Sequence, residues 1–142
     1  GERVVPAEEF FIGPSVDIMR MTVMEPGDLL TAIRIPATWA GAKFYFEKVT
    51  DRATWDFALV NVAAALHVDG DTIRDARIVC GAVECVPRRL KSVEQAVIGQ
   101  PKNEDTALIA GRIAAQGATP VQYNGYKVPL MENLVRRAVR DS

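Results

Sequence analysis

The chain has few of the residues on which hydrolytic active sites and metal centres depend. Its 142 residues include one histidine and two cysteines. Cys80 and Cys85 are too few for a disulfide framework, and their separation differs from the C-x-x-C spacing of zinc and redox sites. His67 ends an apolar run and has no nearby partner at ligand spacing. We therefore interpret both cysteines as core or surface thiols and His67 as a strand-end side chain, and we expect no metal site.

Several common catalytic motifs are also missing. The sequence contains no Walker loop, G-x-G-x-x-G, G-x-S-x-G or H-E-x-x-H motif, which excludes the usual signatures of nucleotide-binding proteins, esterases and zinc proteases. A catalytic triad needs a base beside a nucleophile, and the sequence nominates no Ser or Cys partner for His67. We assign no catalytic residue.

Neither excess charge nor a long apolar run is present. The formal net charge is -1 and the pI is about 5.9, so nothing in the charge favours nucleic acid or an anionic membrane as a partner. Apolar stretches such as Val62–Leu66 fall far short of the roughly 20 residues that span a bilayer. The N-terminus lacks a basic-then-apolar signal pattern. We expect a cytoplasmic protein with no membrane span.

The composition is that of a chain that buries a core, with 49% apolar and 25% charged residues. Up to Pro36, however, Pro6, Gly13-Pro14 and Pro26-Gly27 limit regular structure to short pieces. We expect residues 1–37 to be the tail end of a preceding subdomain and residues 38–142 to form a domain of their own.

The second region begins with strand-like residues. Phe44, Phe46 and Val49 have the aromatic and β-branched character of a first strand. The apolar runs 58–68 and 72–83 flank Asp69-Gly70-Asp71, and a D-G pair accepts the positive φ values of a tight hairpin. An antiparallel sheet of three or four strands is predicted, and a cover for its apolar face is required.

The periodicity changes from two to about 3.6 in the last third of the chain, which predicts three helices. The first carries Leu90, Val93, Val97 and Ile98 on one face and ends at Gly99. The second is capped by Asn103 and runs to about Gly117. The third begins near Asn124 and tolerates Pro129 only in its first turn. Sheet and helices together predict a two-layer α+β sandwich.

The densest polar cluster runs from Lys48 to Asp56, between two predicted strands. A loop that combines Lys48, Asp51 and Arg52 with Trp55 could hold a polarised ring or a phosphate, because the cations donate hydrogen bonds and the indole excludes water. The alternative is a solvated loop with local salt bridges. Pattern alone leaves both readings open.

Runs of residues along the whole chain resemble, in order, the C-terminal part of the FAD-binding (medium) subunit of molybdenum hydroxylases of the xanthine dehydrogenase and carbon monoxide dehydrogenase type. The matching runs are Phe10–Pro14, Glu25–Pro36, Phe46–Val49 with Asp51-Arg52, Trp55–Ala58, Ile73–Val79 with Gly81–Val83, Tyr126–Leu130 and Leu134–Ala138.

This resemblance implies an oxidoreductase in which FAD lies between N-terminal subdomains and the present C-terminal one. Electrons from a molybdopterin site on a large subunit would pass through two [2Fe-2S] centres on a small subunit to the flavin, and then to NAD or another acceptor. The family's glycine-rich segment that binds the FAD pyrophosphate is not among these residues. We therefore expect a missing N-terminal FAD-binding portion as a partner, and a fragment that alone is inactive and binds FAD weakly or not at all.

The resemblance also implies cofactor-binding residues. The family's leucine against the flavin ring falls on Leu30, and its lysine near the polar edge of the ring falls on Lys48. Asp51 and Arg52, in the following loop, are weaker candidates. A cation at that edge would stabilise the negative charge that the ring gains on reduction, and an apolar side chain would exclude water. For Leu30 the alternative is ordinary core packing.

A second class of function stays open. The chain could be a structural, docking or dimerisation module without cofactor binding of its own. The predicted architecture also resembles the dimerisation domain of flavin disulfide reductases, so the fold by itself does not fix the function.

Overall fold

The computed structural model describes all residues, 1–142. Its centre is a four-stranded antiparallel sheet in the order β1-β2-β3-β4, which confirms the predicted sheet. The strands are β1 (Lys43–Val49), β2 (Val60–Asp69), β3 (Thr72–Gly81) and the two-residue β4 (Arg88–Arg89).

The longest hairpin joins β2 to β3, as predicted. Asp69 pairs with Thr72, and Gly70 in the turn has φ +57°, a conformation that glycine adopts without strain. The two strands do not coincide with the apolar runs 58–68 and 72–83: β2 begins two residues later, and β3 ends two residues earlier. β3 stops at Gly81 because Ala82 has φ 62°, which turns the chain out of the extended conformation.

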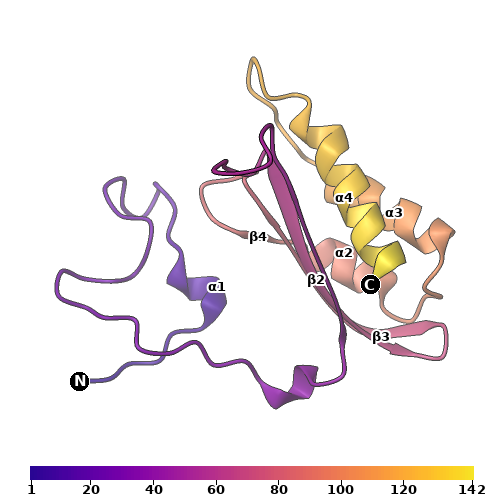
Figure 1. Cartoon of the computed structure of the whole chain (residues 1–142), viewed down its shortest axis with the longest axis horizontal. Coiled ribbons are helices and arrows are strands. Elements are labelled where there is room, and N and C mark those ends of the chain that lie inside the picture. The colour runs from indigo at the N-terminus through magenta and orange to yellow at the C-terminus, as the bar shows by residue number, and fades with distance from the viewer.

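Three helices cover one face of this sheet (Figure 1). They are α2 (Lys91–Val97), α3 (Glu104–Ala114) and α4 (Lys127–Asp141). Alternate residues of β2 and β3 pack against them in a core of 19 buried residues. The two-layer α+β sandwich is confirmed. No helix is both long enough and apolar enough to cross a membrane.

The helix ends follow the predicted signals. Asn103 caps α3, since its Oδ1 accepts a hydrogen bond of 3.0 Å from the amide of Thr106. Pro129 lies in the first turn of α4, where its missing N–H removes no helical bond. Where α3 crosses α4, a Cβ on Gly111 would lie 2.6 Å from the carbonyl oxygen of Glu132, so the small residue is required by close packing.

Residues 1–42 form an extended N-terminal region on the other side of the sheet from the helices (Figure 1). They contain the short helix α1 (Ala7–Phe10) and the 3-10 turn η1 (Ala37–Trp39), and none of them is buried. Glu8 joins α1 to the domain through ion pairs with Arg89 and Lys91. The predicted boundary between residues 37 and 38 falls within η1 and stays a prediction.

Aromatic stacking ties η1 to the sheet. The rings of Trp39 and His67 stack with centroids 4.9 Å apart, and the guanidinium of Arg77 lies 5.0 Å from the Trp39 ring. Nε2 of His67 lies 2.8 Å from the carbonyl oxygen of Thr38. His67 therefore has the packing role of a side chain near a strand end.

Candidate functional site

The sheet face opposite the helices is covered only at one end, where Trp39 of η1 stacks on His67 and lies over Arg77, and we call it the open face. Because side chains alternate along a strand, it receives every second residue of β1, β2 and β3. The strand register arranges nine residues in three rows: Lys48–Asn61–Gly81, Phe46–Ala63–Val79 and Phe44–Ala65–Arg77.

The middle of the open face is flat and apolar. Ala63 and Ala65 on β2 project little above the backbone, whereas Phe44 and Phe46 on the edge strand β1 are 65% and 67% exposed. A floor of small side chains beside exposed aromatic rings offers contact area to a planar ligand. The surface is flat because positions 63 and 65 are alanines; larger side chains there would protrude from it.

A polar row closes one end of this floor. Lys48 donates a hydrogen bond of 2.7 Å from Nζ to the carbonyl oxygen of Asp56. An ammonium group has three N–H donors, so two stay available to a ligand. Asn61 lies beside Lys48, and Gly81 lies beside Asn61.

The loop between β1 and β2 folds back on itself next to the polar row. The amide of Arg52 donates to Oδ2 of Asp56 at 2.9 Å, and the Arg52 guanidinium donates to the carbonyl oxygen of Trp55 at 2.6 Å. Trp55 has φ 53° and is 96% exposed. These local bonds are the ones that a solvated loop would form, but they also fix Asp56 as the acceptor that orients Lys48.

The residues predicted to bind a cofactor are placed in two groups. Lys48, Asp51 and Arg52 lie together at the end of β1 and the start of the following loop, all exposed. Leu30 lies in the N-terminal region, outside any helix or strand, and is 52% exposed. It is not among the buried core residues of this structure. The cofactor role of all four residues stays a prediction.

Two residues near the polar row were missed by sequence reasoning. Nζ of Lys127, on α4, donates to the carbonyl oxygens of Leu59 at 2.9 Å and Ala82 at 2.7 Å. It therefore fixes the ends of β2 and β3 beside the row. Asn61 could have been noticed, because it interrupts the otherwise apolar run before His67. Lys127 carried no local signal, since its partners are distant in sequence.

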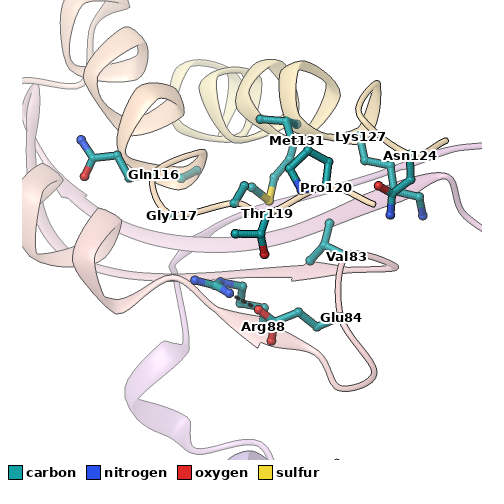
Figure 2. Close-up of a pocket in the computed structure, with 13 residues that line it drawn as sticks. Val83, Glu84, Arg88, Gln116, Gly117, Thr119, Pro120, Asn124, Lys127 and Met131 are labelled. Carbon is teal, nitrogen blue, oxygen red and sulfur yellow. Dashed lines mark hydrogen bonds and ion pairs between the residues drawn. The ribbon is translucent and has the colours of Figure 1, made fainter. Parts of the chain in front are cut away.

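A separate cavity lies on the helix side. It has a volume of about 140 Å³ and is lined by residues of the β3–β4 loop, the α3–α4 loop and the start of α4. Figure 2 shows Arg88, Thr119, Lys127 and Met131 around it, with Arg88 paired to Glu84. Its volume is too small for a dinucleotide, which needs several hundred cubic ångströms.

Two titratable groups with a raised pKa lie on the covered side of the sheet. Burial raises the pKa of the Cys80 thiol to about 12. Burial, and then the hydrogen bond of 2.5 Å that its hydroxyl donates to Glu47, raise the pKa of Tyr45 to about 12. Both groups are therefore neutral at physiological pH, and neither faces the open face.

Comparison with known proteins matches the chain to a family. The profile of the CO dehydrogenase flavoprotein C-terminal domain matches residues 44–142. The glyceraldehyde dehydrogenase medium chain of Sulfolobus acidocaldarius is 33% identical over 145 residues, covering 99% of this chain and 49% of the relative. The aldehyde oxidoreductase FAD-binding subunit of Escherichia coli is 33% identical over 92 residues, covering 65% of this chain and 27% of that subunit.

The fold is similar to a solved structure over almost its whole length. The carbon monoxide dehydrogenase of Hydrogenophaga pseudoflava, in a form that lacks the Mo-pyranopterin moiety of its molybdenum cofactor, matches with a TM-score of 0.82 and 28% identity. That match covers 96% of this chain and 47% of the other. Almost the whole of this chain is matched, but it spans only about half the length of the medium chains to which it is similar.

Proposed function

This chain belongs to the CO dehydrogenase flavoprotein C-terminal domain family, and we propose that it forms one wall of the FAD site in the flavin-binding subunit of a molybdenum hydroxylase. The observation that carries the proposal is the open face: a flat apolar floor that ends in a row with a partly free ammonium group. One side of a flavin ring has the same character, with an apolar body and a polar edge.

The residues present fit such a ring. When bound, FAD would supply the redox chemistry, and the protein would supply orientation and electrostatics. Phe46 and Ala63 would pack against the apolar part of the ring and keep water away. Lys48 would place positive charge at the polar edge, where it stabilises negative charge in a site of low dielectric constant.

The loop after Lys48 has a positioning role in this proposal. Asp56 accepts from the backbone amide of Arg52 and from Nζ of Lys48 through separate oxygens, so the loop and the lysine are held as a unit. Arg52 and Asp51 would flank the approach of the electron acceptor. Leu30 would contact the ring from the N-terminal region.

The proposal extends to partners that the chain itself does not contain. Electrons would arrive from [2Fe-2S] clusters on a small subunit after oxidation of a substrate at the molybdopterin of a large subunit, and would leave to NAD or another acceptor. The names of the relatives support this, since one is an FAD-binding subunit and another belongs to a molybdenum enzyme. A cytoplasmic location belongs to the same proposal.

The exposed apolar residues of the N-terminal region support a further covering partner. Residues 16–35 expose eight large apolar side chains: Val16, Ile18, Met19, Met21, Leu29, Leu30, Ile33 and Ile35. Exposed apolar surface of this extent is typical of an interface. An N-terminal FAD-binding portion, of the kind that completes the relatives, would bury it.

Co-expression tests the proposal. The chain is produced together with the N-terminal half of the Sulfolobus medium chain, and the purified product is examined for bound flavin by absorbance. We expect a yellow complex that retains FAD on gel filtration. A stable but colourless complex would instead favour the docking module.

The isolated chain gives the matching control. Because most contacts to the nucleotide would come from the N-terminal portion, isothermal titration should show FAD binding weaker than micromolar. Micromolar or tighter binding would contradict a site shared with another portion.

A further inference from the structure

Asn61 occupies the centre of the polar row. It lies on β2, directly opposite Lys48 on β1 and directly opposite Gly81 on β3. Its neighbours in sequence, Val60 and Val62, are fully buried in the core, so the alternation of the strand points Asn61 to the open face. It is the only carboxamide among the nine residues of that face.

Gly81 leaves the space that the Asn61 side chain occupies. A Cβ on Gly81 would lie 2.4 Å from Oδ1 and 3.0 Å from Nδ2 of Asn61, closer than non-bonded atoms approach. Gly81 is not among the glycines with positive φ, so its backbone conformation does not demand glycine. The missing side chain at Gly81 is what leaves room for the Asn61 carboxamide.

The carboxamide is not used by the protein itself. The hydrogen bonds formed around the row join Lys48 to Asp56, and Lys127 to Leu59 and Ala82, and they leave Asn61 without a partner. Asn61 is also half-buried. A half-buried amide without hydrogen-bond partners favours binding of a ligand that supplies them, because the new hydrogen bonds stabilise the complex.

The chemistry of the row specifies the kind of ligand. A carboxamide presents one acceptor and two donors side by side, whereas the ammonium of Lys48 presents donors only. A ligand edge with an N–H between two carbonyl groups matches this pair, since the amide can accept from the N–H and donate to one carbonyl while the ammonium donates to the other. The pyrimidine edge of a flavin is such an imide.

We infer that Asn61 is a ring-contacting residue that hydrogen-bonds the imide edge of the flavin on the open face, and that Gly81 keeps the space for it. The inference rests on the proposed function and assigns Lys48 and Asn61 different tasks. Lys48 supplies charge. Asn61 recognises the N–H, and so distinguishes an imide from a ring that lacks this donor.

The test compares two flavins on the ¹⁵N-labelled chain. FMN and N3-methyl-FMN are titrated to millimolar concentrations, and affinities are read from amide shifts of β1, β2 and β3. The wild-type chain should bind FMN about three- to tenfold more tightly than the methylated flavin, the value of one or two hydrogen bonds. The affinity of Asn61→Ala for FMN should be lower by that factor, so that the variant binds both flavins equally.

Gly81→Ala supplies a second, independent variant. The three atoms nearest to its Cβ all belong to the flexible end of Asn61, so the chain should fold normally while the amide is displaced. FMN affinity should fall by the same factor as in Asn61→Ala, with no additional loss in the double variant. Gln116→Ala, which removes an amide at the helix-side cavity, is the control and should leave both affinities unchanged.

The outcomes separate the inference from the proposed function. If FMN shifts the open-face residues but the preference over N3-methyl-FMN survives in Asn61→Ala, the inference is wrong and the flavin site stands. If FMN shifts residues around the helix-side cavity instead, both are overturned. If FMN at millimolar concentration shifts none of the open-face residues, the inference that Asn61 contributes affinity is wrong, and the co-expressed complex alone tests the flavin site.

Discussion

The two faces of the same sheet differ in what they contribute. On the covered face Val62 and Ile78 are completely buried under the helices, whereas on the open face Phe44 and Phe46 are mostly exposed. Since consecutive residues of one strand point to opposite faces, a single strand both stabilises the fold and presents a ligand surface. The comparison predicts that neighbouring substitutions should have separable effects.

The largest expected effect comes from adjacent residues of β3. Ile78→Ala leaves a cavity in the core and should lower the free energy of unfolding by about 2–5 kcal/mol. Val79→Ala, one residue along and on the open face, should lower it by less than about 1 kcal/mol. Urea unfolding followed by circular dichroism measures both. Equal losses would show that the open face is covered in solution by part of the chain itself.

Two glycines sharpen the same contrast at smaller magnitude. Gly111→Ala drives a Cβ against the backbone carbonyl of Glu132 and should destabilise the chain by about 1–3 kcal/mol, even though alanine favours a helix. Gly81→Ala meets a side chain that can move and should stay within about 0.5 kcal/mol of wild type. Thermal unfolding of both variants measures these changes in stability. A larger loss of stability in Gly81→Ala than in Gly111→Ala would contradict the assignment of Gly81 to ligand binding.

The smallest effect concerns alkaline pH and the covered face. Burial, and then the hydrogen bond to Glu47, raise the pKa of Tyr45 from 10.0, the value for a free tyrosine, to about 12 in the folded chain. The unfolded chain therefore releases this proton first, and the stability that Tyr45 contributes is complete below pH 10 and is lost as the pH rises toward 12. Tyr45→Phe should make the decline of the melting temperature over this interval shallower. The open-face variant Phe46→Leu should follow the wild-type profile, and an identical decline in all three chains would refute the role of Tyr45.

Local signals accounted for most of the fold. The cap at Asn103, the turn at Gly70 and the early Pro129 each act within a few residues, so the sequence sufficed to predict the helices and the hairpin. The polar row could not be predicted in the same way, because it depends on the register of two strand pairings at once. The bonds from Lys127 to Leu59 and Ala82 likewise join segments that only the tertiary fold brings together.

Leu30 was predicted from resemblance alone, whereas Lys48 was also part of the polar cluster that the residue pattern singled out. The structure places Lys48 in the polar row of the open face, and it places Leu30 on a separate segment. The contact of each with a flavin is a prediction that depends on what covers the N-terminal region. Lys48 is the sharper case, because its neighbours in the row and its bond to Asp56 are defined within this chain.

The reduction potential of the flavin in the co-expressed complex tests the central assignment of the open face most directly. Replacing the ammonium at the polar edge, Lys48→Met, should lower the two-electron midpoint potential by roughly 30 mV or more, equivalent to about 1.4 kcal/mol of lost charge stabilisation. Lys43→Met, at the other end of β1, removes the same charge away from the row and should leave the potential unchanged. Equal potentials in wild type and Lys48→Met would contradict the assignment of the open face as the flavin wall.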